Sequence, residues 1–472
     1  MINRILFTCL FCIFVRAAYS LVSLPTVLGD NMVVQRDEPI PVWGWADANE
    51  SVTVTFNGSV LSTMADANGY WSIDLPASPA NARNQRLVVR GSSNEIILED
   101  VLIGDVWLCS GQSNMEYGVS KVMDAKAERA AANHPTIRQI AFNHDTSDKP
   151  EDNIRSKGWL VCSDLTAYHF SGVGYFFARR VKNELNIPIG LLRATWAGSR
   201  IEGWIPPEGY QSIPALKADY ADKLDQFPVV LNGVADHQSP LAIYNGVVHP
   251  LTRCKIKGVI WYQGESNVGD GLIYYDKLNA LIAGYRSVFQ KPDLPFYFVQ
   301  LAPYQYRTDS QELPKIWQSQ LNTFLEVPNT GMVVTTDIGT PTNVHPPNKQ
   351  EVGKRLANWA LRDTYGIQGL ISSGPIFDSI STTGNQVAVH FQAGTADGLF
   401  TPAKCEKVSH FEICGADGVW SPAQANIVGN TVILTSFLVP EPTSVRFGWH
   451  HTAVPNLFNG ALLPASPFNS TF

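Results

Sequence analysis

The sequence predicts an α/β protein whose mostly parallel sheet is covered by helices on both faces, with a β-rich region at each end of the chain. Between residues 101 and 366, short apolar stretches typical of strands alternate with segments of helical periodicity, which is the pattern of a parallel sheet with crossover helices. Before and after this segment, strand-like stretches follow one another without helical periodicity. The chain has 472 residues, enough for more than one hydrophobic core.

The first twenty residues differ in composition from the rest. Arg4 precedes an apolar run over residues 5–15, and residues 18–20 (Ala-Tyr-Ser) have the small-x-small pattern of a cleavage site. This run is too short to span a bilayer, and no later stretch is long and apolar enough to do so. We therefore expect a cleaved signal peptide over 1–20 and a secreted or extracytoplasmic protein, in a periplasm, a lumen or the exterior. The net charge of −7 gives no reason to expect a nucleic-acid partner.

Residues 21–100 consist of strand and turn patterns throughout. Stretches such as PVWGW, SVTVTF and EIILED alternate apolar and polar residues, and two Asn-Gly pairs mark tight turns. A small β-sandwich is the predicted fold. We expect Trp43, Trp45 and Trp71 to pack in its core rather than to stack on sugar rings, because tryptophan buries most of its area in folded proteins.

In the central segment, residues 101–366, the expected elements come in a regular order. We expect strands at 106–108, 188–195, 257–262, 296–301 and 332–337, and amphipathic helices at 171–185 and 349–366. Ser113, Gly198, Gln263 and His345 each follow one of these strands. Ligands of an open α/β sheet bind outside the carboxyl ends of its strands, so these four residues are expected to converge on one edge.

The last segment, residues 367–472, returns to strand patterns such as QVAVHF, GNTVILTSF and SVRFGW. It predicts a C-terminal β-rich domain. Cys405 and Cys414 flank an expected hairpin and are the candidate disulfide. No Cys or His cluster in the chain has zinc spacing, so no metal site is expected.

The stretch GDVWLCSGQSNMEYG places Ser113 between a short strand and a helix start. Peptide N–H groups and the helix dipole at such a position favour a developing oxyanion. Acyl transfer needs a nucleophile, a base and donors for the oxyanion, and we interpret Ser113 as the nucleophile and His345 as the base. The alternative for Ser113 is an ordinary helix N-cap, and His249 is the second candidate for the base.

Two further strand ends supply candidate oxyanion donors. Gly198 presents a backbone N–H with no side chain to obstruct an approaching substrate. Gln263 offers a side-chain amide, with Asn267 as its rival. Turn formation alone explains the glycine but not the two amide side chains.

Five stretches, GQSNM, TWAGSRIEGW, IYNGVVHPL, KGVIWYQGESN and NVHPPNKQEVGKRLA, occur in this order, and with them the chain resembles the sialate O-acetylesterase family of SGNH (GDSL-like) carbohydrate esterases. The resemblance extends over almost the whole chain after residue 20. It implies a flavodoxin-like three-layer α/β/α core and hydrolysis of O-acetyl esters on sugars without metal or cofactor. By position, it makes Ser113 the nucleophile and His345 the general base. The N–H groups of Ser113 and Gly198, with the Gln263 amide, form the implied oxyanion hole.

One position departs from the pattern of SGNH hydrolases, which typically carry an aspartate two or three residues before the histidine. Here those residues are Thr342 and Asn343. We therefore predict a Ser–His dyad in which Asn343 or a backbone carbonyl holds His345, with Asp337 as a remote substitute. Because loss of the acid lowers turnover by about four orders of magnitude in an enzyme built around it, a weakly active or inactive protein is an alternative.

Several other residues near these strand ends are candidates for contact with a sugar. Trp196, Trp204 and Tyr262 form either a sugar platform or part of the core, and Asn267 is a further candidate. We expect Glu265 to accept local hydrogen bonds rather than to act as a general acid.

The sequence thus leads to three hypotheses for function. The first is an esterase that removes acetyl groups from O-acetylated sugars, with sialic acid as the substrate. The second is deacetylation of a plant cell-wall polysaccharide such as xylan by the same kind of site. The third is a carbohydrate-binding protein on an esterase scaffold, suggested by the missing acid and the two β-rich ends. The oligomeric state is not predicted.

Overall fold

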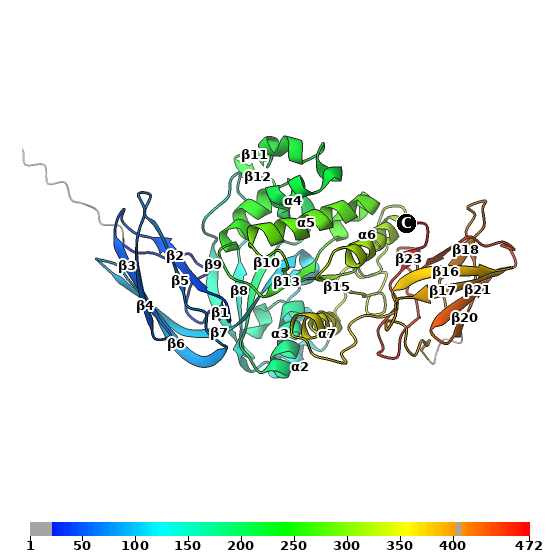
Figure 1. Ribbon diagram of the computed structural model, residues 1–472, viewed down its shortest axis with the longest axis horizontal. Helices are drawn as coiled ribbons and strands as arrows, with labels where there is room; N and C mark the ends of the chain where they lie inside the picture. The colour runs from blue at the N-terminus through cyan, green and yellow to red at the C-terminus, as the bar shows by residue number, and fades with distance from the viewer. Residues whose placement is uncertain (1–20, 403–406) are drawn as a thin grey trace, which may run out of the picture.

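The computed structural model describes residues 21–402 and 407–472, and it places an α/β centre between two β-rich regions (Figure 1). The predicted signal peptide, residues 1–20, and Cys405 lie outside the described residues. In the part of the chain that is described, no helix is long and apolar enough to cross a membrane.

The centre is built on a mostly parallel sheet, as the sequence predicted. Its strand order is β15-β14-β13-β7-β10-β8-β9, and only the β8–β9 pair is antiparallel. From β7 the chain continues to β8 and β10 on one side and then crosses to β13 on the other, so the order reverses beside β7. In open α/β sheets, ligands bind where the strand order reverses in this way. The strands, in sheet order, are β15 (Thr330–Val333), β14 (Phe296–Val299), β13 (Gly258–Tyr262), β7 (Glu95–Gly111), β10 (Ile189–Thr195), β8 (His134–Phe142) and β9 (Ser156–Cys162).

Helices cover both faces of this sheet, with α3 and α7 on one face and α4, α5 and α6 on the other (Figure 1). On α3, the apolar residues Val173, Phe177 and Val181 recur at helical spacing and are fully buried, as expected for an amphipathic helix. The helix predicted over 349–366 is α-helical only to Trp359 and continues as a π-helical turn. The α-helices are α1 (Ser113–Glu116), α2 (Ala125–Ala130), α3 (Gly172–Leu185), α4 (Pro207–Ser212), α5 (Tyr274–Val288), α6 (Glu312–Glu326) and α7 (Lys349–Trp359).

Short 3-10 and π turns complete the connections of the α/β centre. They are Val119–Lys121, Ala167–His169, Ile201–Trp204, Pro214–Leu216, Ala221–Gln226, Tyr244–Val248, His249–Leu251, Glu265–Ile273 and Ala360–Thr364. A small hairpin, β11 (Val230–Leu231) and β12 (Val234–Ala235), lies in the same part of the chain.

Strand β7 links the N-terminal β-rich region to the central sheet. It runs for 17 residues without a break, so the domain boundary predicted at residue 100 falls inside a strand. Its first part pairs with β1 and β6 and its second part with β10 and β13. A continuous strand leaves no flexible linker between the two regions. The other N-terminal strands are β1 (Val33–Gln35), β2 (Ile40–Trp45), β3 (Ser51–Phe56), β4 (Ser59–Met64), β5 (Tyr70–Leu75) and β6 (Asn81–Arg90).

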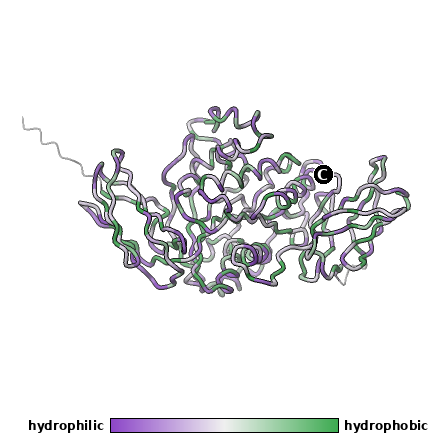
Figure 2. The backbone as a smooth tube through the Cα atoms, viewed as in Figure 1, coloured by the Kyte–Doolittle hydropathy of each residue, from purple (hydrophilic) through white to green (hydrophobic). Residues whose placement is uncertain are grey.

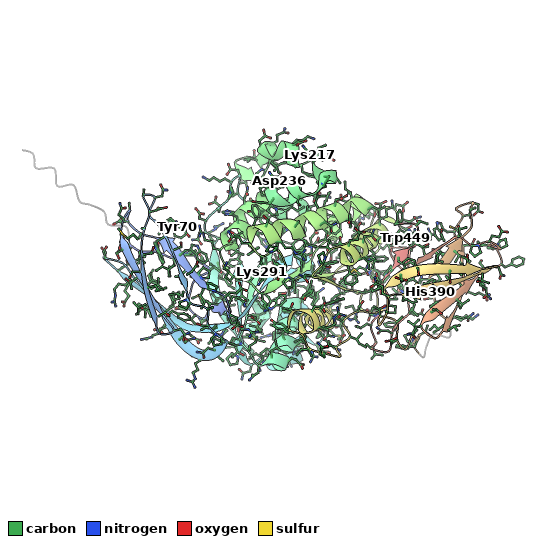
Figure 3. All side chains as sticks on the ribbon, viewed as in Figure 1. Tyr70, Lys217, Asp236, Lys291, His390 and Trp449 are labelled. Atoms are coloured by element: carbon green, nitrogen blue, oxygen red, sulfur yellow. The ribbon has the colours of Figure 1, made fainter. Side chains whose placement is uncertain are left out.

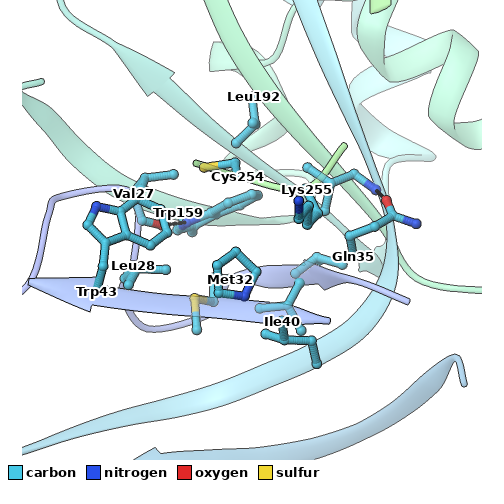
Figure 4. A pocket seen from close by; sticks show the side chains of 14 residues that line it. Val27, Leu28, Met32, Gln35, Ile40, Trp43, Trp159, Leu192, Cys254 and Lys255 are labelled. Carbon is cyan, nitrogen blue, oxygen red and sulfur yellow. Dashed lines mark hydrogen bonds between the residues drawn. The ribbon is translucent and has the colours of Figure 1, made fainter. Parts of the chain in front are cut away.

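The N-terminal region also packs against the central sheet through side chains. The indole N–H of Trp159 on β9 donates to the carbonyl of Val27, with 2.8 Å between the two atoms. A cavity of about 40 Å³ remains at this junction, lined mainly by apolar side chains (Figure 4). Trp43 and Trp71 are 2% and 1% exposed, as predicted for core residues, whereas Trp45 is only partly buried.

The C-terminal region contains two four-stranded antiparallel sheets, in which both hydrophobic and hydrophilic residues occur (Figure 2). Along residues 386–390 and 431–435, buried side chains alternate with exposed or partly exposed ones. The last strand of the region is tied to the α/β centre, because the backbone N–H of Asn469 donates to Gln318 Oε1 on α6 at 2.9 Å. The strands are β16 (Phe377–Thr383), β17 (Gln386–Phe391), β21 (Thr431–Thr435) and β20 (Gln424–Val428) in one sheet, and β19 (Ser421–Pro422), β18 (Phe411–Cys414), β22 (Ser444–Phe447) and β23 (Phe468–Asn469) in the other.

Cys414, which the sequence predicts to pair with Cys405, is a free thiol, and Cys405 lies outside the described residues. Cys414 is the last residue of β18 and lies opposite Ser444 of β22 in the sheet register. Its thiol is buried and is held beside Ser444. The sulfur therefore belongs to the packing between neighbouring strands.

Candidate active site

The turn that follows β7 presents Ser113 at the carboxyl edge of the central sheet. Gly111, the last residue of β7, has a φ of +135°, and a Cβ there would lie 2.2 Å from the carbonyl oxygen of Tyr262. Only glycine fits this close approach of two backbones. Ser113 then begins the four-residue helix α1. As at any helix start, its N–H has no partner within the helix, and no hydrogen bond from it to another described residue is formed.

The structure brings Ser113 and His345 together although 232 residues separate them in the chain. The distance from Ser113 Oγ to His345 Nε2 is 2.8 Å, within the range that proton transfer requires. Burial lowers the pKa of His345, and the positive charges of Lys349 and Lys121 lower it further. The imidazole is therefore neutral near pH 7 and able to accept a proton.

The two predicted orienting residues do not contact the imidazole ring. Asn343 Oδ1 accepts the backbone N–H of His345 at 3.0 Å, so Asn343 fixes the loop rather than the ring. Asp337 instead accepts two hydrogen bonds from the guanidinium of Arg355, at 2.8 and 2.7 Å. The prediction for Asp337 is wrong because this carboxylate pairs with Arg355 and forms no hydrogen bond with His345. The ring of Tyr117 stacks on the imidazole, with 5.8 Å between centroids and 23° between planes.

Gly198 lies in the turn after β10 with its N–H free. Its φ is +75°, and a Cβ built on it would meet no atom within 4 Å, so the residue borders open space. Its carbonyl accepts hydrogen bonds from Gln238 Nε2 at 3.0 Å and Ser266 Oγ at 2.9 Å, which fixes the peptide plane. Its N–H donates to no acceptor among the described residues.

Gln263 does not have a free amide, which corrects the prediction that it donates to an oxyanion. Its Nε2 donates to the carbonyl of Ser199 at 3.0 Å and to Asn267 Oδ1 at 2.7 Å. Both amide hydrogens are therefore used, and the side chain is fully buried. Asn267 is fully buried as well, and its Nδ2 donates to Glu202 and Asp270. Neither amide is available to an oxyanion or a substrate.

A buried charge network explains why these amides are so firmly held. Arg200 and Lys277 each contact both Glu202 and Asp270, at nitrogen–oxygen distances of 2.7 to 2.9 Å. Two positive and two negative groups balance one another, as buried charges require. The network ties the turn that contains Gly198 to the loop after β13.

A second buried network, which the sequence analysis missed, lies behind the Ser113–His345 pair. Asn114 is 1% exposed. Its Nδ2 donates to the carbonyl of Val344 at 2.9 Å and to Glu265 Oε1, and its Oδ1 accepts from Lys349 Nζ. Burial raises the pKa of Glu265 and lowers the pKa of Lys349 to about 7. Glu265 accepts a hydrogen bond, as predicted, but its partner Asn114 is 151 residues away and not local in the sequence. The only sequence signal for the network was that Asn114 and Glu265 lie inside the family-like motifs.

Two of the three aromatic residues expected either in a sugar platform or in the core are core residues. Trp204 and Tyr262 are 0% and 1% exposed, so for both the core alternative holds and the sugar platform does not. Trp196 is partly exposed and is stacked between two imidazoles, with centroid distances of 4.8 Å to His144 and 5.1 Å to His237. The two histidines were not singled out because neither follows a predicted strand.

The other candidates from the sequence lie elsewhere or are absent. His249, the second candidate for the base, donates from Nδ1 to the carbonyl of Glu151 and forms no hydrogen bond with Ser113. Among the described residues, no group of three or more His, Cys, Asp or Glu side chains is arranged to hold a metal ion.

Comparison with known proteins identifies the family. A family model described as carbohydrate esterase, sialic acid-specific acetylesterase, matches residues 103–362, more than half of the chain. The chain belongs to this family. It is therefore a carboxylic ester hydrolase by membership, as the motifs predicted.

Sialate O-acetylesterases of mammals are among the relatives of this family member. The human protein is 28% identical over 391 residues, which cover 75% of this chain and 73% of the human one. The mouse protein is 29% identical over 409 residues, covering 74% of each chain. Among solved structures, a carbohydrate acetylesterase from Xanthomonas citri matches with 36% identity and a TM-score of 0.87, covering 95% of this chain and 99% of the other.

Proposed function

We propose that this chain removes acetyl groups from O-acetylated carbohydrates, with Ser113 as nucleophile and His345 as general base. The observation that carries this proposal is the 2.8 Å distance between Ser113 Oγ and His345 Nε2, in a family of carbohydrate esterases. The pair lies at the carboxyl edge of the sheet, where the strand order reverses and where α/β proteins bind ligands.

The first half of the reaction transfers the acetyl group to the enzyme. His345 Nε2 takes the proton of Ser113 Oγ as the oxygen attacks the acetyl carbonyl carbon. The carbonyl oxygen becomes an oxyanion that accepts from the free N–H groups of Ser113 and Gly198. The intermediate then collapses: the bond to the sugar oxygen breaks, and His345 returns its proton to that oxygen.

The second half releases the acetyl group. A water molecule attacks the acetyl carbon of the acyl-serine while His345 Nε2 accepts one of its protons. The same two N–H groups stabilise the second oxyanion. As this intermediate collapses, the proton on His345 returns to Ser113 Oγ, and acetic acid leaves and loses its remaining proton to the solvent to give acetate.

We further propose that the sugar is a sialic acid and that it lies between Trp196 and Lys121. Trp196, stacked between His144 and His237, leaves a partly exposed ring edge beside the turn of Gly198, and this edge would contact the apolar part of a sugar. Sialic acid carries a carboxylate. Lys121, whose Nζ is 5.8 Å from the ring of Tyr117, forms no ion pair with another described residue and offers it a partner.

We also propose a role for each segment of the chain. Residues 1–20 export the protein, residues 101–366 carry the esterase, and residues 21–100 and 367–472 are accessory β-rich regions. An extracytoplasmic location would give the enzyme access to acetylated glycans.

Acetate release from 9-O-acetylated sialic acid and from acetylated xylan tests the proposal. We expect activity on the sialic acid and a loss of about four to six orders of magnitude in kcat for Ser113→Ala, because a nucleophile and its base act as a unit. Ser287→Ala, which removes an exposed hydroxyl from α5 and leaves the hydrogen bonds of the site in place, is the matched control. Activity on xylan alone would remove the sialate assignment. No activity on either substrate or on p-nitrophenyl acetate would favour the carbohydrate-binding alternative.

A further inference from the structure

A hollow of about 360 Å³ separates the N-terminal β-rich region from the α/β centre, away from Ser113. One wall is a face of the β2–β5 ribbon, in which Trp45 is paired with Tyr70 and Pro41 with Asp74. Side chains alternate between the two faces of a strand, so these residues point away from the interior of the β-rich region. Tyr70 lies on the side of this region that faces the centre (Figure 3).

The opposite wall comes from the segment that leads into β13 and from the end of α5. It contributes His249, Arg253 and Lys255, together with Phe289 and Gln290. This wall lies at the edge of the central sheet where the parallel strands begin. Ser113 lies at the opposite edge, after the end of β7. The part of β7 that pairs with β13 and β10, residues 105–111, spans about 20 Å at the usual rise per residue. The hollow is therefore remote from the active site.

Four charged side chains line this hollow without neutralising one another. They are Asp74, Asp152, Arg253 and Lys255, and none forms an ion pair or side-chain hydrogen bond with another described residue. The guanidinium of Arg253 instead lies over the ring of Tyr70, with 4.6 Å between its carbon and the ring centroid. If this surface served only to join the two regions, pairing of its oppositely charged side chains would stabilise the junction. Here they face the open space.

These groups match the chemistry of a sugar. Each hydroxyl of a saccharide both donates and accepts, so a site that holds one combines carboxylates with guanidinium or ammonium groups. Two partly buried aromatic rings, those of Trp45 and Tyr70, line the hollow, and such rings contact the apolar face of a sugar ring. The volume falls in the range of about 300–1,000 Å³ that is typical of small-ligand sites.

We propose that this hollow is a second saccharide site that binds a neutral oligosaccharide chain. Two acidic and two basic side chains line it, so their charges cancel and no net charge selects an ionic ligand. The site needs no part of the Ser113–His345 chemistry. It would hold one portion of a polymeric glycan while another portion is free to reach the active site of the same or another molecule.

Isothermal titration calorimetry with xylohexaose and cellohexaose tests the proposal, because neither carries an acetyl ester. We expect at least one of them to bind, and we expect Trp45→Ala and Arg253→Gln each to weaken binding at least about tenfold, equivalent to about 1.4 kcal/mol. Hydrolysis of p-nitrophenyl acetate should be unchanged in both variants. Arg253 makes no hydrogen bond to a described residue, so this variant is expected to fold even if Trp45→Ala does not.

Phe437→Ala is the matched control, because this aromatic residue is fully exposed in the C-terminal region. It should bind the hexasaccharides as the wild type does. If neither hexasaccharide binds the wild type, or if Arg253→Gln binds as tightly as the wild type, the hollow is not a saccharide site. Binding of 3′-sialyllactose alone would overturn the assignment to a neutral chain. A failure of the proposed esterase activity would leave these binding results unaffected.

Discussion

Replacing Asn114 with alanine should separate the positioning of His345 from the stability of the fold. The Asn114 amide is 1% exposed and makes three hydrogen bonds, to Val344, Glu265 and Lys349. Leaving a buried partner unsatisfied costs about 1–3 kcal/mol, so three lost bonds predict a decrease of about 3–9 kcal/mol in the free energy of unfolding. That is a large fraction of the roughly 5–15 kcal/mol by which a domain is stable.

The same substitution should also slow catalysis. Asn114 follows Ser113 directly and holds the carbonyl of Val344, the residue before His345. The amide thus couples the two ends of the Ser113–His345 hydrogen bond. A misplacement of about 1 Å costs about a hundredfold in rate, so we expect kcat on p-nitrophenyl acetate to fall about a hundredfold while KM changes little.

Asn459→Ala is the matched control for this experiment. Asn459 is also 1% exposed, and its amide bonds four backbone groups within the C-terminal region. Urea unfolding and steady-state kinetics should show a loss of stability in both variants but a loss of kcat only in Asn114→Ala, measured where each variant is folded. If Asn114→Ala is destabilised but keeps the kcat of the wild type, the amide has no role in positioning His345.

Three other outcomes follow from the geometry of the site. Burial lowers the pKa of Lys349 to about 7, from 10.5 in the unfolded chain, so the unfolded state binds more protons between these values. Urea unfolding at several pH values should therefore show stability rising with pH more steeply in the wild type than in Lys349→Met, by up to about 1.4 kcal/mol per pH unit; equal slopes would contradict this. Burial and nearby positive charges lower the pKa of His345. We therefore expect kcat/KM to decrease in acid only below about pH 6.5. Lys121→Gln should move this limb to higher pH, and a shift in the opposite direction would refute the assignment. Gly198→Ala places a side chain in the left-handed region without a clash, so thermal unfolding should report a loss of about 1–2 kcal/mol, and an unchanged stability would count against the observed turn.

The fold was predictable where local periodicity determines it. The sequence pattern predicts the whole of helix α3, because its apolar residues form one continuous face. It also predicts the whole of strand β10, because an apolar run stands there between turn residues. The continuity of β7 was not predictable in the same way. Its two parts pair with different partners, and an apolar strand has the same local pattern whichever partners it meets.

The sequence predicted only those parts of the site whose position follows from the end of a strand. Ser113 and Gly198 follow β7 and β10, and the strand order alone brings their turns together. Residue type, however, does not reveal whether a polar group is already used. Gln263 has the right chemistry for an oxyanion donor, but both of its amide hydrogens are engaged. Such pairings join segments that are distant in the chain, so no local pattern announces them.

The absence of an orienting acid changes the role that His345 can play. A carboxylate beside the imidazole would fix its tautomer and stabilise the imidazolium. Here the backbone of the loop is held by Asn343 and the ring by Tyr117, while Nδ1 forms no hydrogen bond to another described residue. Orientation is thus supplied without the charge. The positive charges of Lys349 and Lys121 oppose protonation of the ring, which makes the imidazolium a stronger acid and the imidazole a weaker base. Such a histidine protonates the departing sugar oxygen readily but assists the attack of Ser113 less, so formation of the tetrahedral intermediate should limit the rate.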